Sequence, residues 1–88
     1  MAMYKVQLKK APEKFIRRQN RKVQNQIISA IRKLEKNPRP EQAKKLAAMT
    51  DLYRMRTGDY RVVYTIQNKK LIVLVVRISH RKDVYSRL

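Results

Sequence analysis

The sequence predicts a single α+β domain with an N-terminal strand, a two-helix hairpin and then an antiparallel β-meander. The hydrophobic period changes twice, from 2 over residues 4–8 to 3.6 over residues 21–34 and back to 2 after Thr50. The 88 residues suffice for one hydrophobic core but not for two, so one domain is expected over residues 1–88. Helices that precede an antiparallel sheet pack on one of its faces, which leaves the other face open.

The first strand is expected at residues 4–8, where alternate side chains are apolar. A helix follows it, because Pro12 suits a first helical turn and Glu13 complements the positive end of the helix dipole. The side chains that this helix is predicted to bury are Ala11, Phe15 and Ile16.

A second, longer helix is expected from about residue 21. Its apolar residues recur at spacings of three and four, the pattern of a helix that packs one face against a core. These residues are Val23, Ile27, Ala30, Ile31 and Leu34. The opposite face is basic and carries Arg21, Lys22, Arg32, Lys33 and Lys36. Pro38 and Pro40 end the helix, because proline lacks an amide donor and restricts the residue before it.

Beyond the prolines, residues 41–48 are expected to form one or two helical turns with Leu46 pointing inwards. Three strands then follow, at about residues 51–57, 60–67 and 70–79, because the hydrophobic period returns to 2.

Turn residues separate these strands. Gly58, the only glycine in the chain, joins the first two, and Asn68 lies in the tight turn before the third. One face of the middle strand is predicted to carry Tyr60, Val62, Tyr64 and Ile66, and the other Arg61, Val63 and Thr65. Residues 71–76 are continuously apolar, which is typical of a central strand.

The net charge of +17 comes from 23 lysines and arginines against 6 acidic residues. Such a charge attracts polyanions, and the cationic side chains repel one another. We therefore expect the free protein to be only marginally stable, and we infer an acidic partner that neutralises part of the charge. No segment approaches the roughly 20 apolar residues that span a bilayer, and residues 1–3 are too short for a secretory signal. We therefore expect a cytoplasmic protein without membrane contact. The lack of cysteine excludes disulfides, thiolate metal sites and a cysteine nucleophile.

Three arginines lie in the first predicted hairpin. Arg54 and Arg56 are two residues apart in a strand, so they share a face, and the hairpin brings Arg61 onto the neighbouring strand. Permanent cations on a rigid sheet can hold a phosphodiester. The hairpin therefore suggests a nucleic-acid site, with a solvated sheet face as the plainer alternative.

The last predicted strand leads into His80, Arg81 and Tyr85. Cleavage of a phosphodiester needs neutralisation of the phosphorane charge, a base for the nucleophilic hydroxyl and an acid for the leaving oxygen. An imidazole can take either proton-transfer role, and a tyrosine can orient a nucleotide or stack on a base. A lone histidine near a strand end is more often a surface or core residue, so convergence with the arginines is what favours a site.

The acidic residues form no cluster in the sequence, which argues against a two-metal nuclease. We expect neither a metal nor another cofactor. A metal-free ribonuclease would use the 2′-hydroxyl of the RNA as its nucleophile and would leave DNA uncut.

Two motifs carry a resemblance to a known family. Residues 46–64 contain Tyr-Arg-x-Arg-x-Gly-Asp-Tyr-Arg-Val-x-Tyr, and the chain closes with His-Arg-x-x-Val-Tyr. With the order of elements, these motifs resemble the RelE/ParE toxin superfamily of prokaryotic type II toxin–antitoxin modules over nearly the whole chain. The resemblance implies a cognate antitoxin, expected to be acidic, that wraps the toxin and inactivates it. The complex would be hetero-oligomeric and would bind operator DNA through the antitoxin.

The RelE branch, which we favour, implies an mRNA interferase: a metal-independent endoribonuclease that cuts mRNA in the ribosomal A site and so inhibits translation. Its partners would be the ribosome and mRNA. The ParE branch implies a DNA gyrase inhibitor without nuclease activity. A third reading is a catalytically weak toxin that acts with its antitoxin mainly to repress its own operon.

The resemblance also assigns roles to individual positions. It assigns phosphate binding to Arg54 and Arg56, stabilisation of the transition state to Arg61, protonation of the leaving group to Arg81, and contact with the nucleotides at the cut to Tyr85.

One departure from the family pattern changes the expected base. The best-known RelE pattern has lysines where this chain has Arg54 and Arg56, and a lysine can lose its proton whereas an arginine effectively cannot. The resemblance therefore implies His80 as the base, as in RelE relatives that use a C-terminal histidine.

Overall fold

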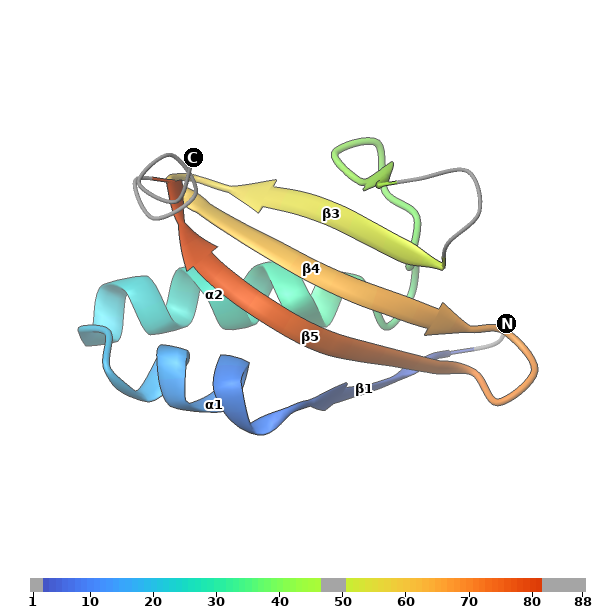
Figure 1. Ribbon diagram of the computed structural model, residues 1–88, viewed down its shortest axis with the longest axis horizontal. Coiled ribbons are helices and arrows are strands. Elements are labelled where there is room, and N and C mark those ends of the chain that lie inside the picture. Colours follow the sequence, from blue (N-terminus) through green and yellow to red (C-terminus); the bar gives the residue numbers. More distant parts are fainter. Residues whose placement is uncertain (1–2, 47–50, 82–88) are drawn as a thin grey trace.

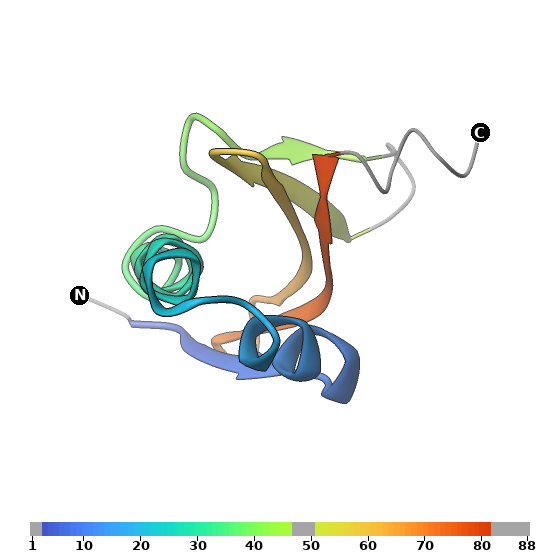
Figure 2. The same cartoon turned by 90° about the vertical axis from the view of Figure 1, so that its left-hand side faces the viewer.

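In the computed structural model, residues 3–46 and 51–81 are described; there, five strands form one sheet and two helices cover one face of it (Figure 1). The elements are β1 (Lys5–Leu8), α1 (Lys10–Arg17), α2 (Arg21–Lys33), β2 (Lys44–Lys45), β3 (Leu52–Thr57), β4 (Tyr60–Gln67) and β5 (Ile72–His80). Figure 2 shows both helices on the same side of a strongly curved sheet. The predicted α+β class is confirmed.

The strand order in the sheet is β1-β5-β4-β3-β2. Strands β3, β4 and β5 form the predicted antiparallel meander. Strand β1 pairs with β5 in parallel, Val6 opposite Val73, because the two helices carry the chain back across the sheet before the meander begins. The sheet is therefore mixed, a feature that the hydrophobic period did not predict.

The core lies between the helices and this sheet. Its helical half contains the predicted stripe of α2, in which Ile27, Ile31 and Leu34 are buried. Its strand half is buried at Met55, Val62, Tyr64, Ile66, Val73, Val75 and Ile78. Helix α2 starts at Arg21 because the side chain of Asn20 accepts a hydrogen bond from the backbone N–H of Val23, at 2.9 Å.

The predicted burial of Ala11 is wrong. Helix α1 starts at Lys10, and Pro12 and Ile16, one turn apart, face the core while Ala11 is exposed. Phe15 is half-buried and packs against the core, as expected.

The predicted helical turns at residues 41–48 are also wrong over the part that the structure describes. Residues 44–45 form the short strand β2 instead, with Lys44 opposite Arg54. The backbone N–H of Leu46 donates to the carbonyl of Leu52 at 2.9 Å, and the Leu46 side chain is 46% exposed. Pairing with the edge of β3 satisfies the backbone there without a helix. Residues 47–48 lie outside the described residues.

A bulge in β5 decides which side chains reach each face. Val63 pairs with Arg77 whereas Tyr64 pairs with Val75, so Val76 is an extra residue with no partner on β4. A one-residue bulge shifts the alternation of side chains by one position.

The consequence appears at the end of β5. Val75 is buried before the bulge and Ile78 after it, so even-numbered residues face the helices beyond Val76. His80 therefore lies on the helix side of the sheet, opposite Tyr60. Ser79, although it is also buried, lies on the other side, opposite Arg61.

Residues 38–39, which follow α2, are hydrogen-bonded to side chains of the sheet and of the β4–β5 turn. The hydroxyl of Tyr64 donates to the carbonyl of Pro38 at 2.8 Å, and Arg39 donates to the Tyr53 hydroxyl and to Asn68, each at 3.2 Å. Burial raises the pKa of Tyr64 to about 12, because it penalises the charged phenolate.

Candidate functional site

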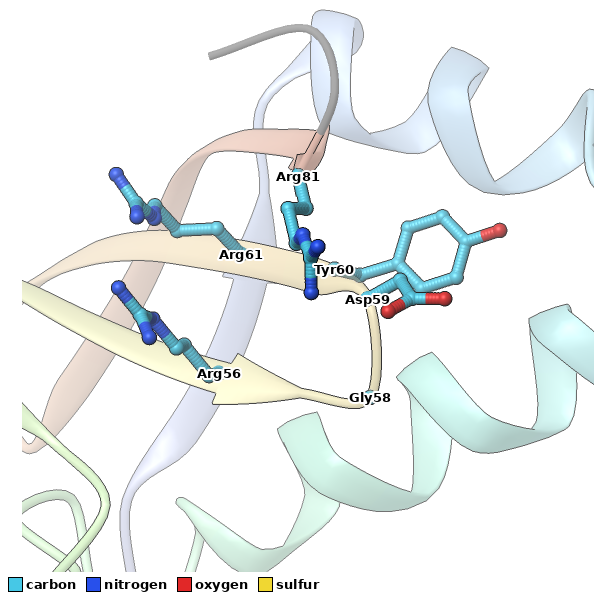
Figure 3. Close-up of a pocket in the computed structure, with 6 residues that line it drawn as sticks. All are labelled: Arg56, Gly58, Asp59, Tyr60, Arg61 and Arg81. Atoms are coloured by element: carbon cyan, nitrogen blue, oxygen red, sulfur yellow. The ribbon is translucent and has the colours of Figure 1, made fainter. Parts of the chain in front are cut away.

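A pocket of about 150 Å³ opens at the turn between β3 and β4 (Figure 3). It is lined by Arg56, Gly58, Asp59, Tyr60, Arg61 and Arg81. Pockets for whole small molecules usually measure about 300–1,000 Å³. The size and the arginines suit one phosphate group of a longer molecule.

The hairpin itself brings two of these arginines together. Arg56 and Arg61 are directly opposite each other on β3 and β4, and Figure 3 shows their side chains extending to the same side of the sheet. Gly58 has a φ of 58° at the first of the two turn residues, a conformation that favours glycine there in a type II′ hairpin. Like charges placed directly opposite each other destabilise a sheet, and a bound anion would relieve that repulsion.

Arg81, the residue directly after β5, reaches the same pocket. Its backbone N–H donates to the carbonyl of Asp59 at 2.7 Å, which ties the end of β5 to the β3–β4 turn. In Figure 3 its side chain extends across β4 towards the turn. The predicted meeting of Arg56, Arg61 and Arg81 is thus present in the structure.

The pocket is one end of a longer basic strip on the open sheet face. Arg54 lies two residues from Arg56 on β3 and shares its face, but it does not line the pocket. Its row across the sheet runs from Lys44 through Arg54 and Val63 to Arg77. Lys44 and Arg77 were not predicted as site residues, because their places depend on strand register and on the β5 bulge.

His80 lies at the same end of the sheet but on the opposite face. Its ring packs edge-on against Tyr60, with centroids 5.1 Å apart, and Tyr60 packs edge-on against Phe15 of α1 at 6.0 Å. The expected convergence of this histidine with the arginine side chains is therefore not seen. The bulge is the cause, because without the extra Val76 the side chain of His80 would point to the open face.

Tyr85, the remaining predicted site residue, lies outside the described residues. Within residues 3–46 and 51–81, no three histidine, cysteine or carboxylate side chains gather as a metal site. The same residues include no helix long and apolar enough to cross a membrane.

Three lining residues were not predicted as site residues: Gly58, Asp59 and Tyr60. The available signal was their position, because a two-residue turn between two arginine-bearing strands must lie beside both arginines. Asp59 is the only carboxylate among the residues described as lining the pocket.

Two comparisons of the sequence with known proteins both match toxins of type II toxin–antitoxin systems or their relatives. The family model described as the ParE toxin of the type II toxin–antitoxin system, parDE, matches residues 5–85. The mRNA interferase toxin RelE of Escherichia coli K12 is 34% identical over 68 residues, which cover 73% of this chain and 70% of the relative.

Solved structures agree with this. The archaeal RelE–RelB complex from Pyrococcus horikoshii contains a chain with a TM-score of 0.80 and 27% identity, over 90% of this chain and 96% of that one. The intact E. coli RelBE toxin–antitoxin complex matches with a TM-score of 0.75 and 25% identity, over 90% and 96% of the two chains.

Proposed function

The chain belongs to the RelE/ParE superfamily of type II toxin–antitoxin toxins, and on that premise we propose that it is a metal-independent, ribosome-dependent mRNA endoribonuclease that inhibits translation. The observation that carries the proposal is the meeting of Arg56, Arg61 and Arg81 around one small pocket. The relatives named mRNA interferase support it, because their similarity extends over most of the chain.

The proposed reaction is a transesterification. The 2′-hydroxyl of the RNA attacks the adjacent phosphorus, the bond to the 5′-oxygen breaks, and negative charge develops on the phosphorane oxygens and on the leaving oxygen. Arg56 and Arg61 stabilise the phosphorane. Arg81 donates a hydrogen bond to the leaving 5′-oxygen, and a water molecule protonates that oxygen. Arg54 holds a neighbouring phosphate along the strip.

Two sequence-predicted residues complete the proposed site. Tyr85 contacts the nucleotides at the cut, as the resemblance implies. His80 stays a prediction for the proton-accepting role, and its ring is separated from the arginine face by Tyr60 and the sheet.

The proposed partners follow from the same premise. An antitoxin binds and inactivates the toxin, and the net charge of +17 suits an acidic one. The related structures are toxin–antitoxin complexes, which supports this partner. The toxin acts in the cytoplasm, where it meets the ribosome and mRNA, and the antitoxin complex binds operator DNA.

Inhibition of DNA gyrase without nuclease activity is the second candidate function. The observation that favours it is the family model, which is that of the ParE toxin. The interferase ranks first because the 34%-identical relatives are RelE proteins and because the pocket arginines suit a phosphodiester.

The test adds the purified chain to ribosomes translating a defined message, maps new 5′ ends, and measures gyrase supercoiling in parallel. We expect cuts in the message and normal supercoiling. Arg61→Ala should cut at least about tenfold more slowly, whereas Arg32→Ala, on the exposed face of α2, should cut normally. An intact message with inhibited supercoiling would establish the gyrase alternative; an intact message with normal supercoiling would favour the weak toxin.

A further inference from the structure

We propose that Arg77, together with Arg54, forms a second phosphate-binding subsite, which holds the message phosphate next to the one in the pocket, and that Lys44 extends this subsite. The inference rests on the proposed ribonuclease function. The three cations come from β5, β3 and β2 and lie in one row across the sheet. Lys44 is opposite Arg54. Val63 of β4 is opposite both Arg54 and Arg77.

The bulge at Val76 places the Arg77 side chain on the face of the sheet that the two helices do not cover (Figure 2). Before the bulge, Val75 faces the helices, and regular alternation would turn Arg77 the same way. The extra residue instead turns Ile78 into the core and Arg77 outwards, where its side chain is exposed. A charge that would be costly beneath the helices thus joins the arginine-bearing face.

The row lies next to the pocket on this face. Arg54 and the pocket residue Arg56 are two positions apart on β3, so their side chains point the same way from backbone positions about 6.6–6.8 Å apart. This spacing is close to the separation of neighbouring phosphates along a single RNA strand. An RNA strand whose scissile phosphate occupies the pocket can therefore present an adjacent phosphate to the row.

Arg54 and Arg77 can contact one phosphate together. They lie on either side of Val63, two strand spacings or about 9.4–9.8 Å apart at the backbone. The valine adds neither charge nor a hydrogen-bonding group, and both arginine side chains are long enough to reach over it. Each guanidinium presents a fork of N–H donors that matches phosphate oxygens. Lys44, directly opposite Arg54, adds a third positive charge beside them.

An anion would also relieve repulsion within the row. Among residues 3–46 and 51–81, no hydrogen bond or ion pair engages the side chains of Lys44, Arg54 and Arg77. Lys44 and Arg54 are like charges directly opposite each other, an arrangement that destabilises a sheet. A bound phosphate compensates these charges, so the row is suited to a polyanion that already reaches the pocket.

The test combines Arg77→Gln with a change in the message. Glutamine keeps a polar side chain but removes the charge. Synthetic messages carry a neutral methylphosphonate in place of the phosphate on the 5′ side or on the 3′ side of the scissile one. All messages, including the one with every phosphate intact, have 2′-O-methyl groups at the mapped cut and beside the altered linkages, which prevent cleavage. The affinity of each protein is measured for ribosomes that carry each message.

We expect Arg77→Gln to bind the all-phosphate complex about tenfold more weakly than the wild type does, because a charge-assisted contact is lost. One of the two methylphosphonates should weaken wild-type binding by a similar factor, and its position identifies the phosphate in the row. The same methylphosphonate should weaken binding of Arg77→Gln by at most about threefold, because both changes remove one contact.

Two variants serve as matched controls. Lys45→Gln removes the same charge as Lys44→Gln, but from the opposite face of β2. Lys44→Gln should weaken binding of the all-phosphate complex and Lys45→Gln should not. Arg32→Gln, on the exposed face of α2, controls for the loss of one arginine charge and should bind all the complexes as the wild type does.

Affinity of Arg77→Gln within about twofold of the wild type for the all-phosphate complex would overturn the proposal. An equal loss of affinity for every message would also overturn it, because Arg77 would then contact ribosomal RNA and not the message. Cleavage of an unmodified message by the wild type is measured in parallel. If the wild type cuts nothing, the proposed function fails, and the subsite with it. If the wild type cuts and Arg77→Gln binds normally, the subsite alone is rejected.

Discussion

An arginine and a lysine carry the same charge, but only the lysine can give up its proton under ordinary conditions. Because Arg54 and Arg56 are arginines and not lysines, these two side chains can supply positive charge and hydrogen bonds but cannot act as a base. Proton transfer must then come from another side chain. Sequence reasoning recognised this need and chose His80, whereas the structure places the His80 side chain on the helix side of the sheet, beside Tyr60.

The arginine positions could be predicted at this scale because alternation along a strand depends only on sequence spacing. The alternation of Arg54, Met55 and Arg56 holds, with the methionine buried. The face of His80 could not be predicted, because it depends on a bulge at Val76, the last residue of a continuously apolar run in which side chains do not alternate between apolar and polar.

Tyr64 gives a residue-scale prediction about pH. Burial raises its pKa from 10.0 to about 12, so between these values the unfolded chain loses a proton that the folded chain keeps. Its contribution to stability is complete below pH 10 and falls as the pH rises towards 12. Over that range the stability advantage of the wild type over Tyr64→Phe should shrink by roughly 2–3 kcal/mol.

Urea denaturation of both proteins at several alkaline pH values measures this difference. Ile66→Val is the control, because it weakens the core without removing a titrating group, and its difference from the wild type should stay constant. A wild-type advantage over Tyr64→Phe that is flat from pH 10 to pH 12 would refute the linkage.

At the scale of elements, the β3–β4 hairpin is a compromise between stability and function. The hairpin places Arg56 of β3 opposite Arg61 of β4, and β2 places Lys44 opposite Arg54 of β3. Strand β3 therefore forms one pair of like charges with each of its two neighbouring strands. Such pairs reduce stability. Sequence patterns predicted the hairpin, and β2 was missed because two residues of edge pairing leave no periodic signal.

Arg56→Gln should therefore stabilise the protein by about 0.2–1 kcal/mol, because it removes the repulsion across the hairpin. The same change should slow RNA cleavage, since one phosphate contact is lost. Chemical denaturation and the ribosome assay measure the two effects. Arg32→Gln removes one charge from the exposed face of α2 and should change neither quantity appreciably. A loss of stability in Arg56→Gln would contradict the proposed compromise.

Gly58→Ala tests the turn. An alanine at a φ of 58° costs about 1–2 kcal/mol, and its methyl group would displace the Gln26 amide. Gly58→Asn should cost less, since asparagine tolerates this conformation better. Thermal unfolding of the two variants measures the order. Combining Gly58→Ala with Gln26→Ala should not restore stability, because the backbone term remains; full recovery would show that the contact with Gln26 was the main term.

At the scale of the whole molecule, the two-layer α+β architecture followed from changes in hydrophobic period, because burial of one face dictates those periods. The parallel pairing of β1 with β5 did not follow, since it depends on where the two helices return the chain. The same limitation applied to the basic strip: Lys44 and Arg77 join it only through register.

The net charge of +17 makes stability depend on salt. Raising KCl from about 50 mM to about 500 mM screens repulsion between exposed cations, so the midpoint of thermal unfolding should rise. A variant with Arg21, Lys22 and Lys33 changed to glutamine should show a smaller rise. A midpoint that falls with added salt would mean that self-repulsion is not what limits stability.

The most direct test of the central claim replaces a single ribose at the mapped cut by its 2′-deoxy form in an otherwise unchanged message. If the arginine pocket promotes attack by the 2′-hydroxyl, the wild-type protein cuts the all-ribose message at this position and leaves the substituted one intact there. Cleavage of both messages at the same position and rate would contradict the claim.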